Sequence, residues 1–518
     1  MSIFSSIKKE QPPKEKNNST EPIYLGKSFD DREKWLKNCF HQSSDITFHT
    51  FIVNETQCAV VYLQGMVDQS LFDENVLKPI LSTDFTIPKS NFFHKLLDLK
   101  QISAMSSKLI TDMHMAAESV LEGEVLLVIE GDNRMLAFPF TKFDKRSINE
   151  PSTENVIRGP KESFVEDIST NITLIRRRIK SSSLKMEQKE IGEITKTRVV
   201  IGYLEGICKP ELVEEVRNRL SEIQMDGVIG SSYLEEYMDD YPYSPFPQME
   251  KTERPDVVSA SLLEGRVVVF VDGTPIPLLI PGNFYMFLQS AEDYYQRYIS
   301  ATWIRWIRYI FLLTSLFLPS FYIAITTFHP EMIPTNLLIS VAGARDNVPF
   351  PALVEALIME LAFEGLREAG IRTPKAVGQA ISILGALVIG QAAVQAGIVS
   401  APMVIIVSLT GIASFIIPHY DLAFSLRFLR FPIMILAGTF GLFGLTMGAL
   451  LIYIHLVSLR SFGMPYLAPT APLRLSDLKD VFIRAPWWMM NRRPDRLSPM
   501  NPKRANTNKI SNGEDEGD

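Results

Sequence analysis

Four glutamates stand in an otherwise apolar segment, Val348 to Arg372, and they are the residues of this chain best suited to act on ions. They are Glu355, Glu360, Glu364 and Glu368. At about 100° per residue the last three fall on one stripe of a helix. Carboxylates at membrane depth are costly and normally face a bundle interior or a water-filled cavity. The stripe therefore marks the first candidate site.

Two interpretations fit this stripe of glutamates. In a ring-shaped oligomer it would form rings of carboxylates, which admit cations and exclude anions. The candidate residues for lining or gating such a path are Val354, Glu355, Leu357, Glu360, Leu361 and Glu364. In the alternative, Glu364 and Arg367 or Arg372 neutralise one another while the helix lies in the membrane interface. The sequence leaves open whether residues 348–372 cross the membrane or re-enter it.

Long apolar runs surround the acidic segment and must position it. Tyr309 to Phe328 holds 20 residues without a charge, enough to cross a hydrocarbon core of about 30 Å. Ala380 to Ser400 and Met403 to Ile417 predict a helical hairpin, and Ile433 to Leu456 predicts a fourth span. The chain should thus end in an all-α, multi-span membrane domain over residues 297–465.

Small residues recur four apart in the second apolar run, where they would let helices approach closely in lipid. These helix-packing candidates are Gly378, Ser382, Ala386 and Gly390. They could serve packing within one chain or contact between subunits.

Basic residues near the ends of the runs predict the orientation. Arg297, Arg305 and Arg308 precede the first run, and seven Lys and Arg residues follow the last one, between residues 460 and 496. Both the N-terminal region and the tail of residues 466–518, basic and then acidic, should be cytoplasmic. An even number of crossings follows.

An internal repeat organises the N-terminal region. Ala59 to Leu81 parallels Val199 to Leu220, and Leu121 to Pro139 parallels Leu263 to Pro281, both at an offset of about 141 residues. The repeat predicts two related α/β subdomains, residues 26–148 and 149–296. Residues 1–25 are polar and are predicted to form a disordered tail.

The segment between the repeats, Glu154 to Lys180, predicts a connecting helix. Val165, Ile168, Ile172, Ile175 and Ile179 recur at helical spacing. Pro160 suits a first turn, and the basic run Arg176 to Lys180 suits the negative end of the helix dipole. An anion site at the Arg-Gly-Pro turn is the competing interpretation.

Composition and absent motifs exclude several classes of protein. A net charge of -7 argues against a nucleic-acid binder, and three scattered cysteines indicate neither a disulfide framework nor a zinc site. No Walker, dinucleotide, zinc-protease or nucleophile-elbow motif is present. We expect no enzyme activity, no catalytic residue, no cofactor and no metal.

Three stretches together resemble one family: Glu154 to Lys180, Pro245 to Pro275 and Val348 to Ser400. They are similar to the A subunits of the GerA-type spore germinant receptors (GerA, GerB and GerK), over residues 45 to 465. Ser163 departs from the glycine expected there. The resemblance implies a receptor in the inner membrane of the endospore, working with a permease-like B subunit and a lipoprotein C subunit. It also implies a homo-oligomer, a pentamer in this family, that forms a nutrient-gated channel for monovalent cations and starts germination.

Two other functions compete with a channel. The chain could be a solute transporter subunit, although its apolar runs show no inverted repeat. It could also be a non-conducting scaffold or sensor that the membrane half merely anchors.

Overall fold

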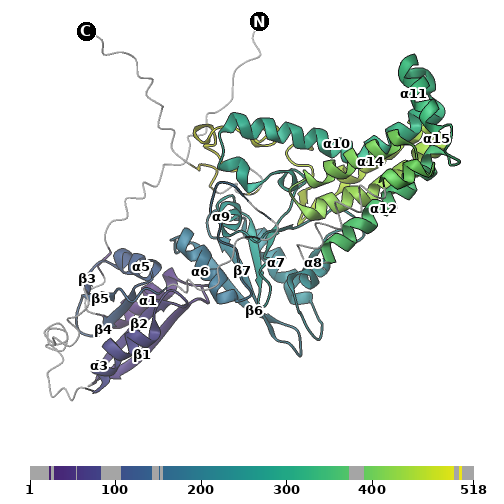
Figure 1. Ribbon diagram of the computed structural model, residues 1–518. Helices are drawn as coiled ribbons and strands as arrows, with labels where there is room; N and C mark the ends of the chain where they lie inside the picture. The colour runs from purple at the N-terminus through teal and green to yellow at the C-terminus, as the bar shows by residue number, and fades with distance from the viewer. Residues whose placement is uncertain are drawn as a thin grey trace, which may run out of the picture. The chain divides into compact units, whose positions relative to one another are not determined.

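The computed structural model describes residues 23–24, 28–53, 55–82, 107–142, 151, 154, 156–372, 390–494, 497 and 501–504. The chain forms two compact units, one of Met1–Asp144 with Ile179–Ser182 and one of Lys145–Arg178 with Ser183–Asp518 (Figure 1). Apart from Ile23 and Tyr24, the tail predicted for residues 1–25 lies outside the described residues.

The first unit is a five-stranded antiparallel sheet in the order β1-β2-β4-β5-β3. Its strands are β1 Ile46–Val53, β2 Thr56–Leu63, β3 Lys108–Ile110, β4 Val125–Ile129 and β5 Met135–Phe138. Its helices are α1 Phe29–Cys39, α2 Gln69–Phe72, η1 Asp73–Leu77, α3 Lys78–Ser82 and α5 Met113–Leu121. Leu36 and Val120 pack on one face of the sheet, and Phe72 and Val76 pack on the other.

The second unit begins with a sheet of the same topology, β6-β7-β9-β10-β8, also antiparallel. Its strands are β6 Leu184–Ile191, β7 Thr197–Leu204, β8 Glu250–Lys251, β9 Val267–Val271 and β10 Leu278–Ile280. Its helices are α6 Ile168–Arg178, α7 Pro210–Glu222, α8 Ser231–Met238 and α9 Pro255–Leu263.

The two sheets confirm the duplication. Strand β2 begins at Thr56 and β7 at Thr197, a shift of 141 residues, which is the offset read from the sequence. The hairpins β4–β5 and β9–β10 turn at Gly131 and Gly273, whose φ angles are +86° and +80°. Both turns use the left-handed conformation that glycine adopts without strain.

The connecting helix is confirmed, but its predicted start is wrong. Helix α6 begins at Ile168, not near Pro160. Asp167 Oδ2 accepts hydrogen bonds from the Thr170 amide at 2.8 Å and from its hydroxyl at 2.7 Å, so this carboxylate caps the helix. Pro160 lies in the preceding segment, where its carbonyl accepts from Arg254 Nη2 at 3.0 Å.

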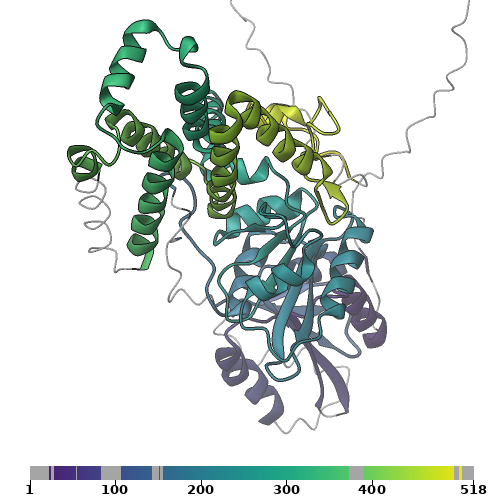
Figure 2. The same cartoon turned by 90° about the vertical axis from the view of Figure 1, so that its right-hand side faces the viewer.

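A helical bundle follows the second sheet within the same unit (Figure 2). Short helices η3 Met286–Leu288 and η4 Ala291–Tyr294 lead into it. The bundle helices are α10 Tyr298–Phe328, η5 Pro330–Met332, α11 Thr335–Arg345, α12 Ala352–Arg372, α14 Ala401–Phe415 and α15 Tyr420–Ser458. By length and composition, α10 and α15 are long and apolar enough to cross a membrane.

Helix α15 is two helices, which differs from the single span predicted for residues 433–456. Gly441 has non-helical angles, φ 63° and ψ -142°. A Cβ built on Gly448 would lie 3.6 Å from Ile433 Cγ1. In a straight helix these positions are about 22 Å apart along the axis, so the chain folds back at Gly441.

The two arms of α15 therefore run antiparallel beside α10. Leu316 of α10 shares a buried cluster with Ile433 of the first arm and Leu456 of the second. A Cβ on Gly441 would lie 3.0 Å from Phe328, which places the fold-back at the end of α10. Figure 1 shows α11 at this same end, away from the second sheet.

The chain returns from the bundle to the second sheet. This C-terminal segment contains β11 Arg460–Ser461, β12 Met464–Pro465, η6 Leu478–Asp480 and η7 Trp487–Met489. Phe462 joins the core of the second sheet, and Tyr466 is buried in a cluster with Phe287 of η3 and residues of the bundle. Residues 466–494, predicted as part of a tail, thus pack closely on the rest of the unit.

Candidate functional sites

The acidic helix, α12, is fixed in the bundle by its first glutamate. Glu355 is fully buried. Its Oε2 accepts hydrogen bonds from the Ser400 amide at 3.0 Å and hydroxyl at 2.8 Å, and its Oε1 accepts from Arg345 Nε at 3.2 Å. The carboxylate thus ties α12 to the ends of α11 and α14.

The second glutamate pairs with an arginine 70 residues away. Glu360 Oε2 accepts from Arg430 Nη1 at 2.5 Å. Both side chains are only 2% exposed. Arg430 also donates through Nε to the Ser315 carbonyl at 2.8 Å. One buried guanidinium therefore joins α12, α15 and α10.

The last two glutamates are paired as well. Glu364 Oε1 accepts from Arg367 Nη1 at 3.1 Å and lies 3.3 Å from Arg427 Nε. Glu368 pairs with Arg372 at 2.6 Å on the exposed side. Each glutamate of the stripe has an arginine beside it within this one chain. The Glu364–Arg367 pair is the one named in the neutralisation alternative.

The predicted lining residues divide between two faces of α12. Val354 and Leu361 are 36% and 63% exposed, and Ile358 lies between them on the same face. Glu355 and Glu360 are on the buried face, and Leu357 packs at the edge of the cluster that contains Met359. We call Val354, Ile358 and Leu361 the outer stripe. The role of these residues in conduction remains a prediction.

Of the small-residue face, Gly378, Ser382 and Ala386 lie outside the described residues. Gly390 is buried, and a Cβ placed on it would lie 3.5 Å from Val404 of α14. At this position the small residue serves packing within the chain.

A buried charge cluster at the base of α10 was missed by the sequence analysis. Asp293 accepts from Arg305 Nε at 3.0 Å and from both terminal nitrogens of Arg308 at 2.7 Å. Arg305 Nη1 also donates to Asp480 Oδ1 at 3.0 Å. These arginines were interpreted only as orientation signals, because nothing local in the sequence connects them to Asp293 or Asp480.

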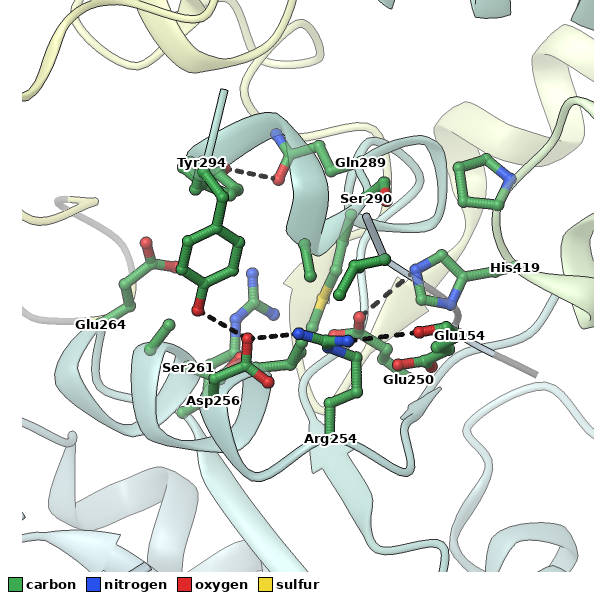
Figure 3. A pocket seen from close by; sticks show the side chains of 18 of the residues that line it. Glu154, Glu250, Arg254, Asp256, Ser261, Glu264, Gln289, Ser290, Tyr294 and His419 are labelled. Atoms are coloured by element: carbon green, nitrogen blue, oxygen red, sulfur yellow. Dashed lines mark hydrogen bonds and ion pairs between the residues drawn. The ribbon is translucent and has the colours of Figure 1, made fainter. Parts of the chain in front are cut away.

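A cavity of about 350 Å³ lies where the second sheet subdomain, the bundle and the C-terminal segment meet (Figure 3). Its lining comes from residues 154 and 156, β8, α9 and the turn after it, the segment around η3 and η4, the connection between α14 and α15, η7 and Arg504. The polar and aromatic lining residues are Glu154, Glu250, Arg254, Asp256, Ser261, Glu264, Arg266, Gln289, Ser290, Tyr294, Tyr295, His419, Trp487 and Arg504.

Burial changes the protonation of the two facing groups in this cavity. Glu250 Oε1 lies 3.4 Å from His419 Nε2. Burial lowers the pKa of His419 to about 4, so the imidazole is neutral at pH 7. Burial also raises the pKa of Glu250 to about 8, against the opposing charge of Arg266 and with help from Glu154 and Glu264. Burial likewise raises the pKa of Glu154 to about 7.

The raised pKa of Glu250 makes a prediction about stability. Between its ordinary value of 4.5 and about 8, the folded state holds a proton that the unfolded state has released. The contribution of Glu250 to the free energy of unfolding therefore falls as pH rises through this window and is constant above it. We expect Glu250→Gln to raise the thermal unfolding midpoint relative to wild type by an amount that grows from about pH 5 to about pH 8.

The measurement is the unfolding midpoint of the full chain in detergent across this pH range. Glu236→Gln, at an exposed position of α8, is the matched control and should show a constant difference from wild type. A Glu250→Gln difference that is independent of pH would contradict the buried, protonated carboxyl.

The fold and these sites define a class of protein: a duplicated α/β region that leads into an apolar helical bundle in which the four glutamates of α12 pair with arginines of the same chain. The chain belongs to the GerA family, since the model of the Bacillus/Clostridium GerA spore germination protein matches residues 34–496.

Individual relatives cover most of the chain. Uncharacterized membrane protein YfkQ of Bacillus subtilis is 47% identical over 458 residues, 88% of each chain. Spore germination protein KA of the same organism is 42% identical over 92% of this chain and 88% of its own. The crystal structure of the N-terminal domain of the A subunit of the Bacillus megaterium spore germinant receptor GerK3 aligns over 51% of this chain and 98% of its own. That alignment has 31% identity and a TM-score of 0.40.

Proposed function

We propose that this chain is the A subunit of a nutrient-responsive germinant receptor in the inner membrane of the endospore. Family membership and relatives named as spore germination proteins support a role in germination. Its partners are a permease-like B subunit and a lipoprotein C subunit. Several copies, in our working arrangement five, form a nutrient-gated channel for monovalent cations.

In this proposal the bundle lies in the lipid. Helix α12 has 21 residues, about 31 Å at 1.5 Å per residue, enough to span a hydrocarbon core. Arg305 near the start of α10 contacts Asp480 of the C-terminal segment. The chain therefore enters and leaves the bundle at the same end. This fits an even number of membrane crossings with both terminal regions on the spore-core side.

The outer stripe of α12 is the observation that carries the channel proposal. Buried ion pairs hold one face of this helix in the bundle, while Val354, Ile358 and Leu361 are exposed on the other. Around a symmetry axis, five such stripes would form an apolar constriction, which gates by dewetting. The rigid attachment on the buried face would let a small shift of the bundle open it.

A non-conducting scaffold is the second candidate. It is favoured by the pairing of each of the four glutamates of α12 with an arginine, which leaves no row of unpaired carboxylates on this helix to contact cations. In that case the outer stripe faces lipid or a partner subunit.

The test is potassium release from spores that carry Leu361→Ser. A hydroxyl in an apolar constriction lowers the cost of wetting, so we expect release that is faster or independent of nutrient, by about tenfold or more. Ile405→Ser is the matched control, because Ile405 on α14 is 66% exposed and Leu361 is 63% exposed.

Receptor abundance in the spore membrane is measured in parallel, and spores without this chain give the baseline. If Leu361→Ser spores at normal receptor abundance release potassium as wild type does, the outer stripe does not line the conduction path. Equal effects of both substitutions would indicate general damage to the bundle.

A further inference from the structure

The cavity at the junction of sheet, bundle and C-terminal segment has the features of a ligand site. Its volume of about 350 Å³ falls in the range of small-molecule pockets, about 300–1,000 Å³. We propose that it binds a small organic cation with a primary ammonium group and a short apolar body. This site is separate from α12 and does not depend on channel activity.

Above about pH 8, where Glu250 and Glu154 are both ionised, the cavity is lined by four carboxylates and three guanidinium groups. Arg254 pairs with Asp256 at 2.8 Å, and Arg504 lies 3.6 Å from Glu264. Of the two further carboxylates, Glu250 lies near the third guanidinium, Arg266, which donates to the Pro281 carbonyl. Glu154 accepts a hydrogen bond from the Thr252 hydroxyl at 2.7 Å. Because His419 is neutral, it does not balance them.

Glu250 supplies the specific anchor. The residue is only 4% exposed and lines the cavity from β8. Its Oε1 faces His419, while its buried Oε2 has no hydrogen-bond partner among the residues that the structure describes. When Glu250 is ionised, a buried carboxylate oxygen without a donor is costly, and an ammonium group with three N–H donors would satisfy it. Figure 3 shows Glu250 and Glu154 close together beside His419.

The remaining walls fit a short alkyl body. Met286, Val257 and Ala291 line the cavity between the charged groups. A cavity that combines apolar wall with charged groups suits an amphiphilic small molecule.

The position of the cavity gives binding a structural consequence. Glu250 and α9 belong to the second sheet subdomain, His419 to the connection between α14 and α15, and Trp487 to the C-terminal segment. A ligand held by all three stabilises the arrangement in which they meet. Occupancy would thus favour one state of the junction between the sheet and the bundle.

The test uses n-butylammonium chloride as the probe and the full chain in detergent. The pH is about 8.5, which lies above the raised pKa of Glu250, about 8, so that this carboxyl is mostly ionised. Isothermal titration should show saturable binding of one probe per chain. Glu250→Gln should weaken it by about tenfold or more, because the charged acceptor is lost. Glu236→Gln, an exposed change of the same charge, should leave it unaltered.

A second variant tests whether the probe binds inside this cavity, without changing a charge. Ala260 is exposed and lines the cavity, so Ala260→Phe should block the probe while the unfolding midpoint stays near the wild-type value. Three outcomes overturn the proposal: no saturable binding by wild type, equal binding by wild type and both cavity variants, or sodium acetate binding in place of the cation. Equal displacement of the probe by potassium chloride would also overturn it, since it would indicate an inorganic cation site.

Discussion

Arg430→Met should destabilise the bundle by about 3–5 kcal/mol, because it leaves the Glu360 carboxylate buried without its partner. Both side chains are 2% exposed, and Arg430 also holds the Ser315 carbonyl of α10. The expected result is a large fall in the thermal unfolding midpoint in detergent and low abundance in the membrane.

The double variant separates the pair from general damage. Glu360→Gln together with Arg430→Met removes both charges and should recover much of the lost stability, because a buried ion pair contributes little net free energy compared with neutral groups. Arg372→Met is the control on α12, since Arg372 and Glu368 are 77% and 58% exposed, and it should cost under about 1 kcal/mol. A double variant no more stable than Arg430→Met would mean that packing, not charge, holds this position.

Asp293→Asn should lower the free energy of unfolding by a similar amount, about 3–5 kcal/mol, by weakening the contacts at the start of α10. This carboxylate accepts hydrogen bonds from Arg305 and Arg308, and replacing it removes the negative charge that both buried guanidinium groups contact, while Arg305 keeps Asp480. The C-terminal segment should then become sensitive to protease, because Asp480 connects it to the same cluster.

Limited proteolysis of the full chain, followed at residues 466–494, measures this effect together with the unfolding midpoint. Glu292→Gln is the neighbouring control: Glu292 Oε1 accepts from Gln296 on the same short segment and takes no part in the cluster. Equal protease sensitivity of the two variants would show that Asp293 does not hold the segment in place.

Local pattern predicted three of the five strands in each half of the duplicated region. The shared offset aligned β2 with β7 and the hairpin β4–β5 with β9–β10, because the strand pattern depends on neighbouring residues. The start of α6 was misplaced because Pro160 is a permissive signal, whereas the cap that forms comes from Asp167.

The bundle contains two features that local sequence pattern did not predict. Hydropathy identified the apolar run after residue 433 but did not reveal its fold-back at Gly441, because residues 433–456 contain no Asp, Glu, Lys or Arg on either side of that glycine. It also identified α12 as acidic without finding the partners of Glu360, since Arg430 lies 70 residues further along the chain.

By itself, then, the sequence determined the repeat, the apolar runs, the acidic helix and the family resemblance, all of which are carried by residues close together in the chain. Only the tertiary structure decided which charges pair and where the cavity forms. Glu250, His419 and Trp487 come from three distant segments, and their approach depends on packing rather than on spacing in the sequence.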